Sequence, residues 1–548
     1  MSSEAFEELR VASDLLQIAL DRYLNACLAM KHTITNGSSL SVRHRNITGS
    51  ALDSEKVRID VHETILRKSK LAIFYAANKS PNLVPISILP DEILVLVFQY
   101  LVDAIHIPAN ADSTETPAYP LLLSQTCTHW RQLIHRTSSL WSNFRINRGI
   151  GRNGFLSYLK FHTIQTKEAP MDISISEDLS SPELRVPNIL SLVEPFTGRI
   201  ESLRFRVVSF SGSENQRDRV ARLLAGCLQA ANGKLKRLTA TTFYLYRGPN
   251  GNQHWIVESA TNPPNGSSLG LPLSQEYFED ALLTVSSLWF DGLYFNWTSK
   301  LYHGLTSLRL DKNPTCSITE PLLVNILVAS PRLQWLDVRI NITDITTSPT
   351  PVYMPNLEVL ISTDNMSLLQ LIQPGSKELT LSIISRARAS VVQFEQESVG
   401  NMGYDPRFTS FLSRANVVSF YGEGFLRGIV ELLDLLLVAP KIRTLALSYF
   451  IHYTPFNRLA VPTSALDQLL ILKGCRLECS VVRRIIETCG VKELVLSDKS
   501  ITDSSERVIQ NKFSFTEELS NSGNTHIRFV SSDDTSLLSK FVGPVIRS

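Results

Sequence analysis

The sequence predicts an α/β protein in which N-terminal helices and a compact all-α module precede a horseshoe-shaped solenoid with parallel strands on its concave face. Three observations predict this fold class. Apolar residues recur at helical spacing in the first 77 residues. A short, almost wholly apolar helix is expected to begin near residue 90. From about residue 200 onward, one strand-like pattern returns at intervals of 19 to 50 residues.

Composition sets the broad class of the protein. The chain has 548 residues, of which 43% are hydrophobic and only 19% are charged. Soluble domains average roughly 25% charged residues, so this chain has the composition to bury large cores. Its 54 basic and 52 acidic residues leave a net charge of +2. This balance gives no electrostatic reason to expect nucleic acid or an anionic membrane as a partner.

The expected compartment follows from the cysteines and from the absence of long apolar runs. No stretch of the sequence approaches the ~20 apolar residues that a membrane-spanning helix needs. The first ten residues, MSSEAFEELR, are polar and acidic, so we expect no secretory signal. Seven scattered cysteines, an odd number, are typical of free thiols in a reducing compartment. We therefore expect an intracellular protein, in the cytoplasm, the nucleus or both.

The N-terminal segment, residues 1–79, is predicted to form two helices. Residues 4–32 carry apolar side chains near one helical stripe, and residues 55–77 repeat this spacing. Between them, residues 33–54 are polar and are predicted to form a flexible linker. The two helices are expected to pair as a hairpin or a short coil.

A helical module is expected over residues 84–144, with a polar insert at 103–119. Pro90 fits the first position of a helix, and two acidic residues follow it in the first turn. All six residues from Ile93 to Phe98 are apolar. This is more than one buried stripe requires, and a domain of about 60 residues has little interior to surround a helix completely. The pattern therefore favours a second apolar face that binds a partner.

The spacing of apolar residues in this module resembles an F-box, as found in the large F-box families of mushroom-forming fungi. The resemblance rests on Leu89-Pro90-x-Glu92-Ile93-x4-Phe98-x2-Leu101, then Cys127-x2-Trp130-x2-Leu133, then Leu140-Trp141. It implies the substrate-recognition subunit of a cullin–RING ubiquitin ligase, which is not itself an enzyme. Such a subunit binds a Skp-type adaptor through the box and a target protein through the rest of the chain.

The resemblance also implies which residues contact the adaptor. The residues that match the motif are Leu89, Pro90, Ile93, Leu94, Phe98, Leu101, Cys127, Trp130 and Leu133. For each of them, packing inside the module is the alternative role. Leu140 and Trp141 are instead expected to fix the box to the first strands of the solenoid.

The strand-like pattern is apolar-x-x-Leu-x-apolar. Its clear copies are centred on Leu203, Leu238, Leu288, Leu308, Leu336, Leu360, Leu445, Leu469 and Leu494, and weaker copies lie around Leu379, Phe420 and Ile527. Most intervals fall near the 20–29 residues of leucine-rich repeats, and the copies resemble the degenerate repeats of intracellular proteins. An ordinary Leu-rich α/β sheet is the alternative, but it does not explain a pattern that recurs twelve times.

Residues 145–548 are therefore predicted to form the solenoid. One repeat cannot close its own core, so neighbouring repeats stack. Side chains that alternate with the inward leucines lie on the exposed concave face, where aromatic and charged residues suit protein recognition. The candidate target-binding residues are Arg204, Trp289, Arg309, Asp337 and Arg339.

Motifs for other chemistry are weak. Gly149, Gly151 and Gly154 form a literal GxGxxG, but a strand of only three or four residues precedes it, and no run of dinucleotide-binding units follows. Cys475, Cys479 and Cys489 lack the fourth ligand of a zinc site. We therefore expect no cofactor, metal or catalytic residue. Two other functions stay open: a protein-binding scaffold with no role in ubiquitin ligases, and an enzyme that uses the glycine turn.

Overall fold

The structure is a computed structural model of the whole chain. It describes residues 3–36, 42–79, 85–104, 119–146, 160–177, 194–207, 214–242, 254–258, 267–311, 316–347, 349–363, 366–385, 405–426, 429–450, 465–475, 477–497, 501–502, 525–531 and 541. The chain divides into two compact units, residues 1–93 and 94–548, and each is described by itself.

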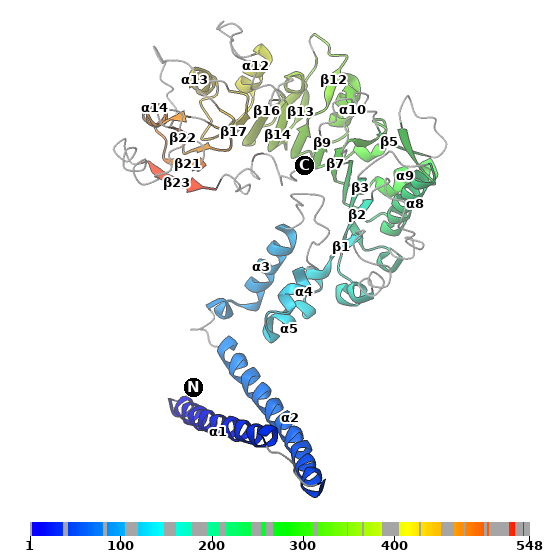
Figure 1. The fold of residues 1–548 in the computed structure, drawn as a ribbon. Helices are drawn as coiled ribbons and strands as arrows, with labels where there is room; N and C mark the ends of the chain where they lie inside the picture. Colours follow the sequence, from blue (N-terminus) through cyan, green and yellow to red (C-terminus); the bar gives the residue numbers. More distant parts are fainter. Residues whose placement is uncertain are drawn as a thin grey trace. The chain divides into compact units, whose positions relative to one another are not determined.

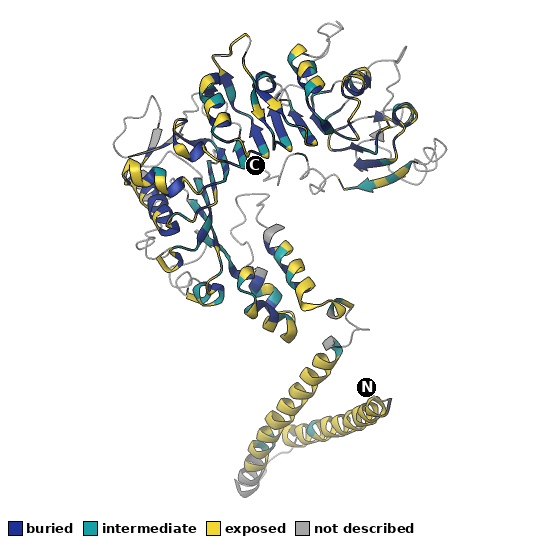
Figure 2. Ribbon diagram, turned by 180° about the vertical axis from the view of Figure 1, so that it is seen from behind, coloured by how far each residue is buried: buried dark blue, intermediate teal, exposed yellow. Residues whose placement is uncertain are grey.

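The first unit consists mainly of two long helices, α1 (Ser3–Asn36) and α2 (Val42–Lys79), followed by the 3-10 helix η1 (Pro85–Ile88). The hydroxyl of Tyr23 in α1 donates a hydrogen bond of 2.7 Å to the carboxylate of Glu55 in α2. Most described side chains of both helices are exposed, including many apolar ones (Figure 2).

The polar segment 33–54 differs from its prediction as a flexible linker. Helix α1 extends to Asn36 and helix α2 already begins at Val42, so most of this segment is helical. Polar composition indicates exposure to solvent, but it does not by itself select an irregular backbone. An exposed helix accepts polar residues on every face when no neighbouring element covers it.

The second unit contains most of the secondary structure. Its helices are α3 (Asp91–Ala104, which begins in the first unit), α4 (Tyr119–Ser124), α5 (Thr128–Arg136), η2 (Ser138–Trp141), η3 (Glu194–Phe196), α8 (Glu214–Ala231), α9 (Gln275–Leu282), η4 (Lys300–Tyr302), α10 (Glu320–Val328), α11 (Ser367–Gln370), α12 (Pro406–Arg414), α13 (Ile429–Val438) and α14 (Cys479–Cys489). Across the described residues of both units, we find no helix with the length and hydrophobicity to span a bilayer.

Fourteen strands in the described ranges form one parallel sheet (Figure 1). In spatial order, which is also chain order, they are β1 (Asn143–Ile146), β2 (Met171–Glu177), β3 (Ile200–Val207), β4 (Arg237–Thr242), β7 (Ser287–Asp291), β9 (Ser307–Leu310), β11 (Trp335–Val338), β14 (Val359–Thr363), β16 (Leu379–Ile384), β17 (Val417–Glu423), β18 (Thr444–Ser448), β19 (Gln468–Ile471), β21 (Glu493–Ser497) and β23 (His526–Val530). Each strand therefore pairs with the strands that precede and follow it in this series.

Shorter strands form separate small sheets. They are β5 (His254–Glu258), β6 (Ser267–Leu271), β8 (Leu293–Phe295), β10 (Ser317–Thr319), β12 (Asn341–Thr343), β13 (Val352–Met354), β15 (Ile372–Pro374), β20 (Leu477–Glu478) and β22 (Ile501–Thr502). β6, β5 and β8 pair in that order, and β10 with β12, β13 with β15, and β20 with β22 make two-stranded parallel ladders. These ladders lie along the connections between strands of the main sheet.

All twelve central positions of the predicted repeat lie on strands of the main sheet, from Leu203 on β3 to Ile527 on β23. The sheet also contains β1 and β2, which the repeat pattern did not reveal. Leu288, Leu308, Leu336 and Leu360 pair in register across four neighbouring strands. Fully burying each such leucine contributes about 1.5–3 kcal/mol relative to leaving it exposed.

We call the face that carries these leucines the core face. Helices α8, α10, α12, α13 and α14 all contribute to the same buried cluster as this face, through Leu224, Leu323, Phe408, Leu432 and Val482. Parallel neighbours require crossover connections, and here these helices supply several of them. Their apolar stripes close the core on this one side of the sheet.

The opposite face of the sheet, which we call the open face, carries the alternate residues. One row of neighbouring positions crosses all fourteen described strands. In strand order the row is Arg145, Ser174, Arg204, Thr239, Trp289, Arg309, Asp337, Ile361, Ser382, Tyr421, Ala446, Leu470, Val495 and Arg528. The row is polar or charged up to β11, apart from Trp289, and mainly apolar from β14 to β21.

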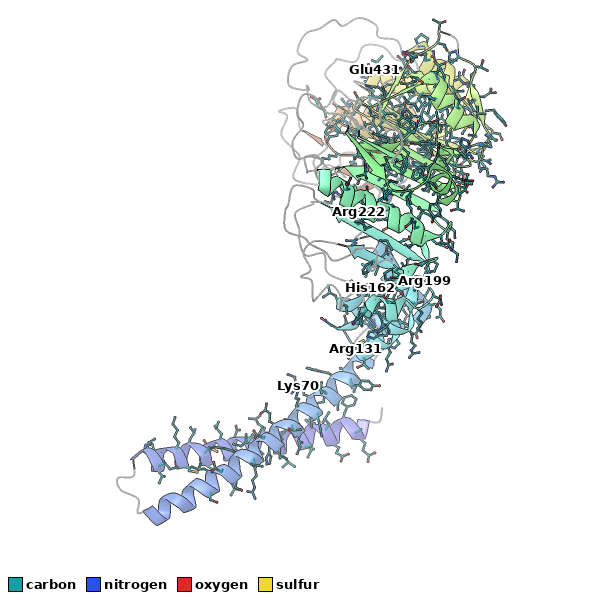
Figure 3. The ribbon with its side chains drawn as sticks, turned by 90° about the vertical axis from the view of Figure 1, so that its right-hand side faces the viewer. Lys70, Arg131, His162, Arg199, Arg222 and Glu431 are labelled. Atoms are coloured by element: carbon teal, nitrogen blue, oxygen red, sulfur yellow. The ribbon has the colours of Figure 1, made fainter. Side chains whose placement is uncertain are left out.

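Trp141 joins the helical module to the first strands. Its side chain is fully buried, and its indole N–H donates to the carbonyl oxygen of Ile134 at 2.9 Å. Its ring lies 5.1 Å from that of Phe161 and 5.6 Å from that of His162. The imidazole of His162 lies 3.2 Å from the Trp141 carbonyl oxygen and 5.4 Å from the ring of Phe144 on β1 (Figure 3). Trp141 therefore has the joining position expected from the sequence.

This junction should make the fold sensitive to acid. Burial lowers the pKa of His162 from 6.5 to about 4, although its contact with the Trp141 carbonyl opposes the shift. The folded state thus favours neutral imidazole, and stability is lost as the pH falls from 6.5 toward 4. We expect a loss of about 2 kcal/mol in the free energy of unfolding between pH 7 and pH 5. Urea unfolding at both pH values measures it; a His162→Asn chain with the same loss would contradict this assignment.

Candidate adaptor-binding helix and the open face of the sheet

Helix α3 begins at Asp91, one residue after the first helical position that the sequence predicts. Pro90 immediately precedes Asp91, and the amide of Ile93 donates to the Pro90 carbonyl oxygen at 3.1 Å. The amide of Leu89 donates to Ile86 at 3.2 Å, which closes the turn before the helix. Asp91 and Glu92 lie in the first turn, where carboxylates complement the helix dipole.

One stripe of α3 packs inside the module. Leu94 and Phe98 are fully buried, and Val102 is nearly so. The ring of Phe98 meets the ring of Trp130 on α5 edge to face, with 4.7 Å between centroids. These positions recur every four residues, so they lie on one side of the helix. In the chain alone, Leu94 and Phe98 present no surface to a partner.

A second apolar stripe of α3 is exposed. Ile93, Leu96, Val97, Tyr100 and Leu101 follow the spacing i, i+3, i+4, i+7, i+8, which places them on another side of the same helix. Leu96 is 65% exposed and Tyr100 is 70% exposed. Soluble proteins seldom expose a contiguous apolar surface without a function for it, so this stripe is a candidate interaction site. Leu96, Val97 and Tyr100 were not among the predicted contact residues, although helical spacing from Ile93 identifies them.

The remaining predicted residues of the module have mixed surroundings. Cys127 is the N-cap of α5, and its sulfur accepts a hydrogen bond of 3.4 Å from the amide of Trp130. Trp130 is half-buried against Phe98, and Leu133 is buried. Leu89 and Pro90 are exposed just before α3. The predicted set thus divides into exposed residues at the start and on one side of α3, and packing residues within the module.

The open face of the sheet holds a cluster of charges on β9, β11 and the residues that follow them. The carboxylate of Asp337 accepts hydrogen bonds of 2.8 Å from two nitrogens of Arg339, and it lies 3.3 Å from Arg309. Asp311 accepts a hydrogen bond of 2.6 Å from Arg309 and lies 3.7 Å from Arg339. Two arginines and two aspartates therefore alternate around one ring of ion pairs.

Trp289 and Asp291 on β7 extend this cluster. The guanidinium of Arg309 lies 4.3 Å from the centre of the Trp289 ring. The indole N–H of Trp289 is buried and has no hydrogen-bond partner in the structure as described. Burial, with a smaller effect from the Asp311 carboxylate, raises the pKa of Asp291 to about 7 despite the nearby arginines.

The structure brings together four of the five predicted target-binding residues: Trp289, Arg309, Asp337 and Arg339. Arg204 lies on β3, with the Thr239 position of β4 between it and Trp289. Asp337 is fully buried, so its carboxylate orients the arginines rather than facing solvent. Asp291 and Asp311 were missed. Asp291 lies two residues beyond Trp289 at the end of β7, and Asp311 lies two residues beyond Arg309, just after β9.

The structure describes only part of the other motifs noted in the sequence. The GxGxxG at residues 149–154 lies outside the described residues. Cys475 and Cys489 are buried, and burial raises the pKa of each thiol to about 12. In the described part of the chain, no three His, Cys, Asp or Glu residues are grouped to hold a metal ion.

Comparison with known families identifies one part of the chain. Residues 86–147 match the F-box-like family. This range contains α3, α4, α5 and the Trp141 junction. F-box domains generally bind Skp-type adaptors. No curated protein matches the chain.

Shortening a side chain to alanine should change stability by different amounts on the two stripes of α3. We expect Phe98→Ala to destabilise the module by about 3–5 kcal/mol, because it removes a buried ring and its contact with Trp130. Leu96→Ala is the matched control on the exposed stripe and should change stability by no more than about 0.5 kcal/mol. Hydrogen exchange of the α5 amides in the full chain measures both changes. Equal effects of the two substitutions would contradict the assignment of the stripes.

The charged cluster should depend on Asp337. We expect Asp337→Ala to cost about 3–5 kcal/mol, because two arginines lose a buried counter-charge. Lys236→Ala breaks an exposed 2.8 Å ion pair with Glu201, and this control should cost less than about 1 kcal/mol. Urea unfolding at pH 7 compares the two variants, and a smaller loss for Asp337→Ala would show that the cluster does not stabilise the sheet.

Proposed function

We propose that the protein is the substrate-recognition subunit of an SCF-type cullin–RING ubiquitin ligase, with a Skp-type adaptor bound on the exposed stripe of α3. The observation that carries the proposal is this stripe of Ile93, Leu96, Val97, Tyr100 and Leu101, which lies within the F-box-like match. Residues that are apolar and exposed in the free chain gain most from burial against a partner.

The proposed contact divides the motif residues into two roles. Leu89, Pro90, Ile93 and Leu101 contact the adaptor directly, together with Leu96 and Tyr100. Leu94, Phe98 and Leu133 hold α3 against the rest of the module, while Cys127 and Trp130 serve mainly as cap and packing partner. The packing residues act on the adaptor only by fixing the orientation of the exposed stripe.

We further propose that residues 145–548 are a solenoid of degenerate leucine-rich repeats that binds a target protein on its open face. Support comes from the chain-ordered parallel sheet and from the helices gathered on its core face. The proposed domains are 1–79, 84–144 and 145–548. The likeness to fungal F-box families stays a prediction.

In this role the protein performs no chemistry itself. It holds a target close to a ubiquitin-charged enzyme that other subunits supply, and proximity raises the rate of transfer. F-box proteins are typically non-catalytic adaptors of this kind.

The first experiment is co-purification of the full chain with a Skp-type adaptor. We expect wild type to form a stoichiometric complex and the Ile93→Asp/Leu96→Asp chain to lose at least about 100-fold in affinity, since central apolar contacts dominate such interfaces. Both substituted residues are exposed, so the variant should remain folded. Ile164→Asp, at a side chain that is 70% exposed outside the module, is the matched control.

Two results would contradict the adaptor proposal. One is a folded wild-type chain that does not bind the adaptor, and the other is a double variant that binds as tightly as the Ile164→Asp control. Either result would leave a protein-binding scaffold with no role in a ubiquitin ligase as the better function.

A further inference from the structure

The described part of the first unit has no buried core. Helices α1 and α2 are 34 and 38 residues long, yet no side chain described on either helix is buried (Figure 2). Helices in proteins gain most of their stability from packing an apolar side against a neighbour. Two helices whose apolar side chains stay in contact with water therefore require a further partner.

One side of α1 already contacts α2. The hydroxyl of Tyr23 donates a hydrogen bond of 2.7 Å to Glu55 of α2. Leu9 and Leu16 precede Tyr23 at intervals of seven residues, so they lie on the same side of the helix. Because α2 is its neighbour, we call this the inner side of α1.

A second stripe lies on another side of α1. We define the outer stripe as Glu4, Glu8, Val11, Leu15, Ile18 and Arg22. Its members follow one another in alternating steps of four and three residues, which is the spacing of a coiled-coil seam. The three apolar members, in the middle, are 49%, 63% and 65% exposed. At 3.6 residues per turn they lie about a third of a turn from Tyr23, so α2 alone cannot cover both sides.

The order of residues in the outer stripe is complementary to itself when reversed. Two acidic residues come first, three apolar residues follow, and Arg22 comes last. When a second α1 runs antiparallel along this stripe, Val11 of each copy meets Leu15 of the other at the centre. Glu4 of each copy then lies level with Arg22 of the other, and Glu8 lies one turn away. Such self-complementarity is what a twofold symmetric dimer requires of its surface.

The two edges of the outer stripe determine which side a second helix approaches. On one edge, Ala12 and Ala19 have small side chains, so the axis of a neighbouring helix can come close. On the opposite edge lie Glu7, Asp14 and Asp21. Two of these carboxylates already accept hydrogen bonds from residues of α1, one from Arg10 and one from Gln17. The alanine edge therefore faces the second copy, and the acidic edge faces solvent.

The comparable stripe of α2 lacks this match. Its exposed apolar residues are Val57, Val61 and Ile65. Ser54 precedes them and Lys68 follows them at helical spacing. Reversal sets Lys68 level with an uncharged serine and forms no ion pair. Within the described part of the first unit, charge complementarity thus favours α1 as the contact between copies.

We propose that the outer stripe of α1 is a dimerisation surface whose partner is α1 of a second copy of this chain, running antiparallel. The dimer buries the apolar residues of both stripes and forms an ion pair at each end. A second copy supplies the reversed order of charges by symmetry, whereas any other partner would have to match it by coincidence. The proposal is independent of adaptor binding, because it uses no residue of α3.

Sedimentation equilibrium of the full chain at micromolar concentration tests this surface. We expect wild type to have about twice the chain mass of 61.3 kDa. Leu15→Asp places a charge at the centre of the interface and should weaken dimerisation by at least about 100-fold. Val61→Asp, at a side chain of α2 that is 53% exposed, is the matched control and should leave the dimer unchanged. Both side chains are exposed in the single chain, so both variants should fold.

An exchange of charges distinguishes contact between copies from contact within one chain. Glu4→Arg alone, or Arg22→Glu alone, sets like charges together in both ion pairs and should weaken the dimer by about 10-fold. A mixture of the two variant chains forms heterodimers in which both pairs join opposite charges, and it should recover the affinity of wild type. Contact within one chain cannot give this recovery, because each variant carries like charges at its two positions.

Each outcome decides the proposal. A wild-type chain that stays monomeric, a Leu15→Asp chain that dimerises as tightly as the Val61→Asp chain, or a mixture no tighter than its components would overturn it. If Leu15→Asp does not fold, the charge exchange decides alone, because recovery on mixing requires two folded chains. A monomeric wild type whose adaptor affinity falls with Leu15→Asp would assign the stripe to the adaptor instead. Unchanged adaptor binding in a chain that fails to dimerise would leave the adaptor proposal intact.

Discussion

The one-sided packing of the parallel sheet determines the rest of the second unit. Leucines such as Leu308 and Leu336 align in register on the core face, and described helices from α8 to α14 close that side. Because those helices leave the open face uncovered, the side chains there must be satisfied in other ways. The structure uses two: ion pairs from β7 to β11, and an apolar cluster from β14 to β21 to which Phe541 also belongs.

The change from charged to apolar residues occurs within one step of the sheet. Asp337 on β11 pairs in register with Ile361 on β14, and both are fully buried. Asp337 is buried because two arginines neutralise it, whereas Ile361 is buried because apolar residues surround it. An arginine over Ile361 would lose its counter-charge. The half from β14 to β21 still holds a buried carboxyl group, Glu423 on β17, which accepts a hydrogen bond of 3.2 Å from the Tyr421 hydroxyl. The boundary between the two halves is therefore set by which side chains can be buried next to each other.

Much of this organisation could be predicted from local pattern. The twelve central positions of the repeat identified strands correctly because strand alternation and stacking leave a periodic signal in the sequence. Arg339 was predicted, whereas Asp311 carried a usable signal that was missed. The segments Leu308–Leu310 of β9 and Leu336–Val338 of β11 pair in register, and each is followed by a charge opposite in sign to the charge at its centre. Two such strands side by side dictate a ring of alternating charges.

Contacts between distant segments could not be predicted in this way. Ser382 and Phe541 are 159 residues apart, and nothing near Phe541 in the sequence indicates which surface it covers. The prediction of a flexible linker over residues 33–54 was wrong for a related reason. Composition indicates solvent exposure, but it does not determine backbone conformation.

Helix α3 illustrates how far reasoning from sequence extends to function. An excess of apolar residues predicted two stripes, and the helix has both: Leu94 and Phe98 pack inward while Leu96 and Tyr100 face solvent. The sequence motif alone assigned Phe98 to the adaptor contact, because a motif records which residue types recur and not which way they point. Solvent exposure separates the residues of α3 that pack inside the module from those that are free to contact a partner. A substitution that tests binding must therefore be made at an exposed position, since at Phe98 loss of the partner and loss of the fold would give the same result.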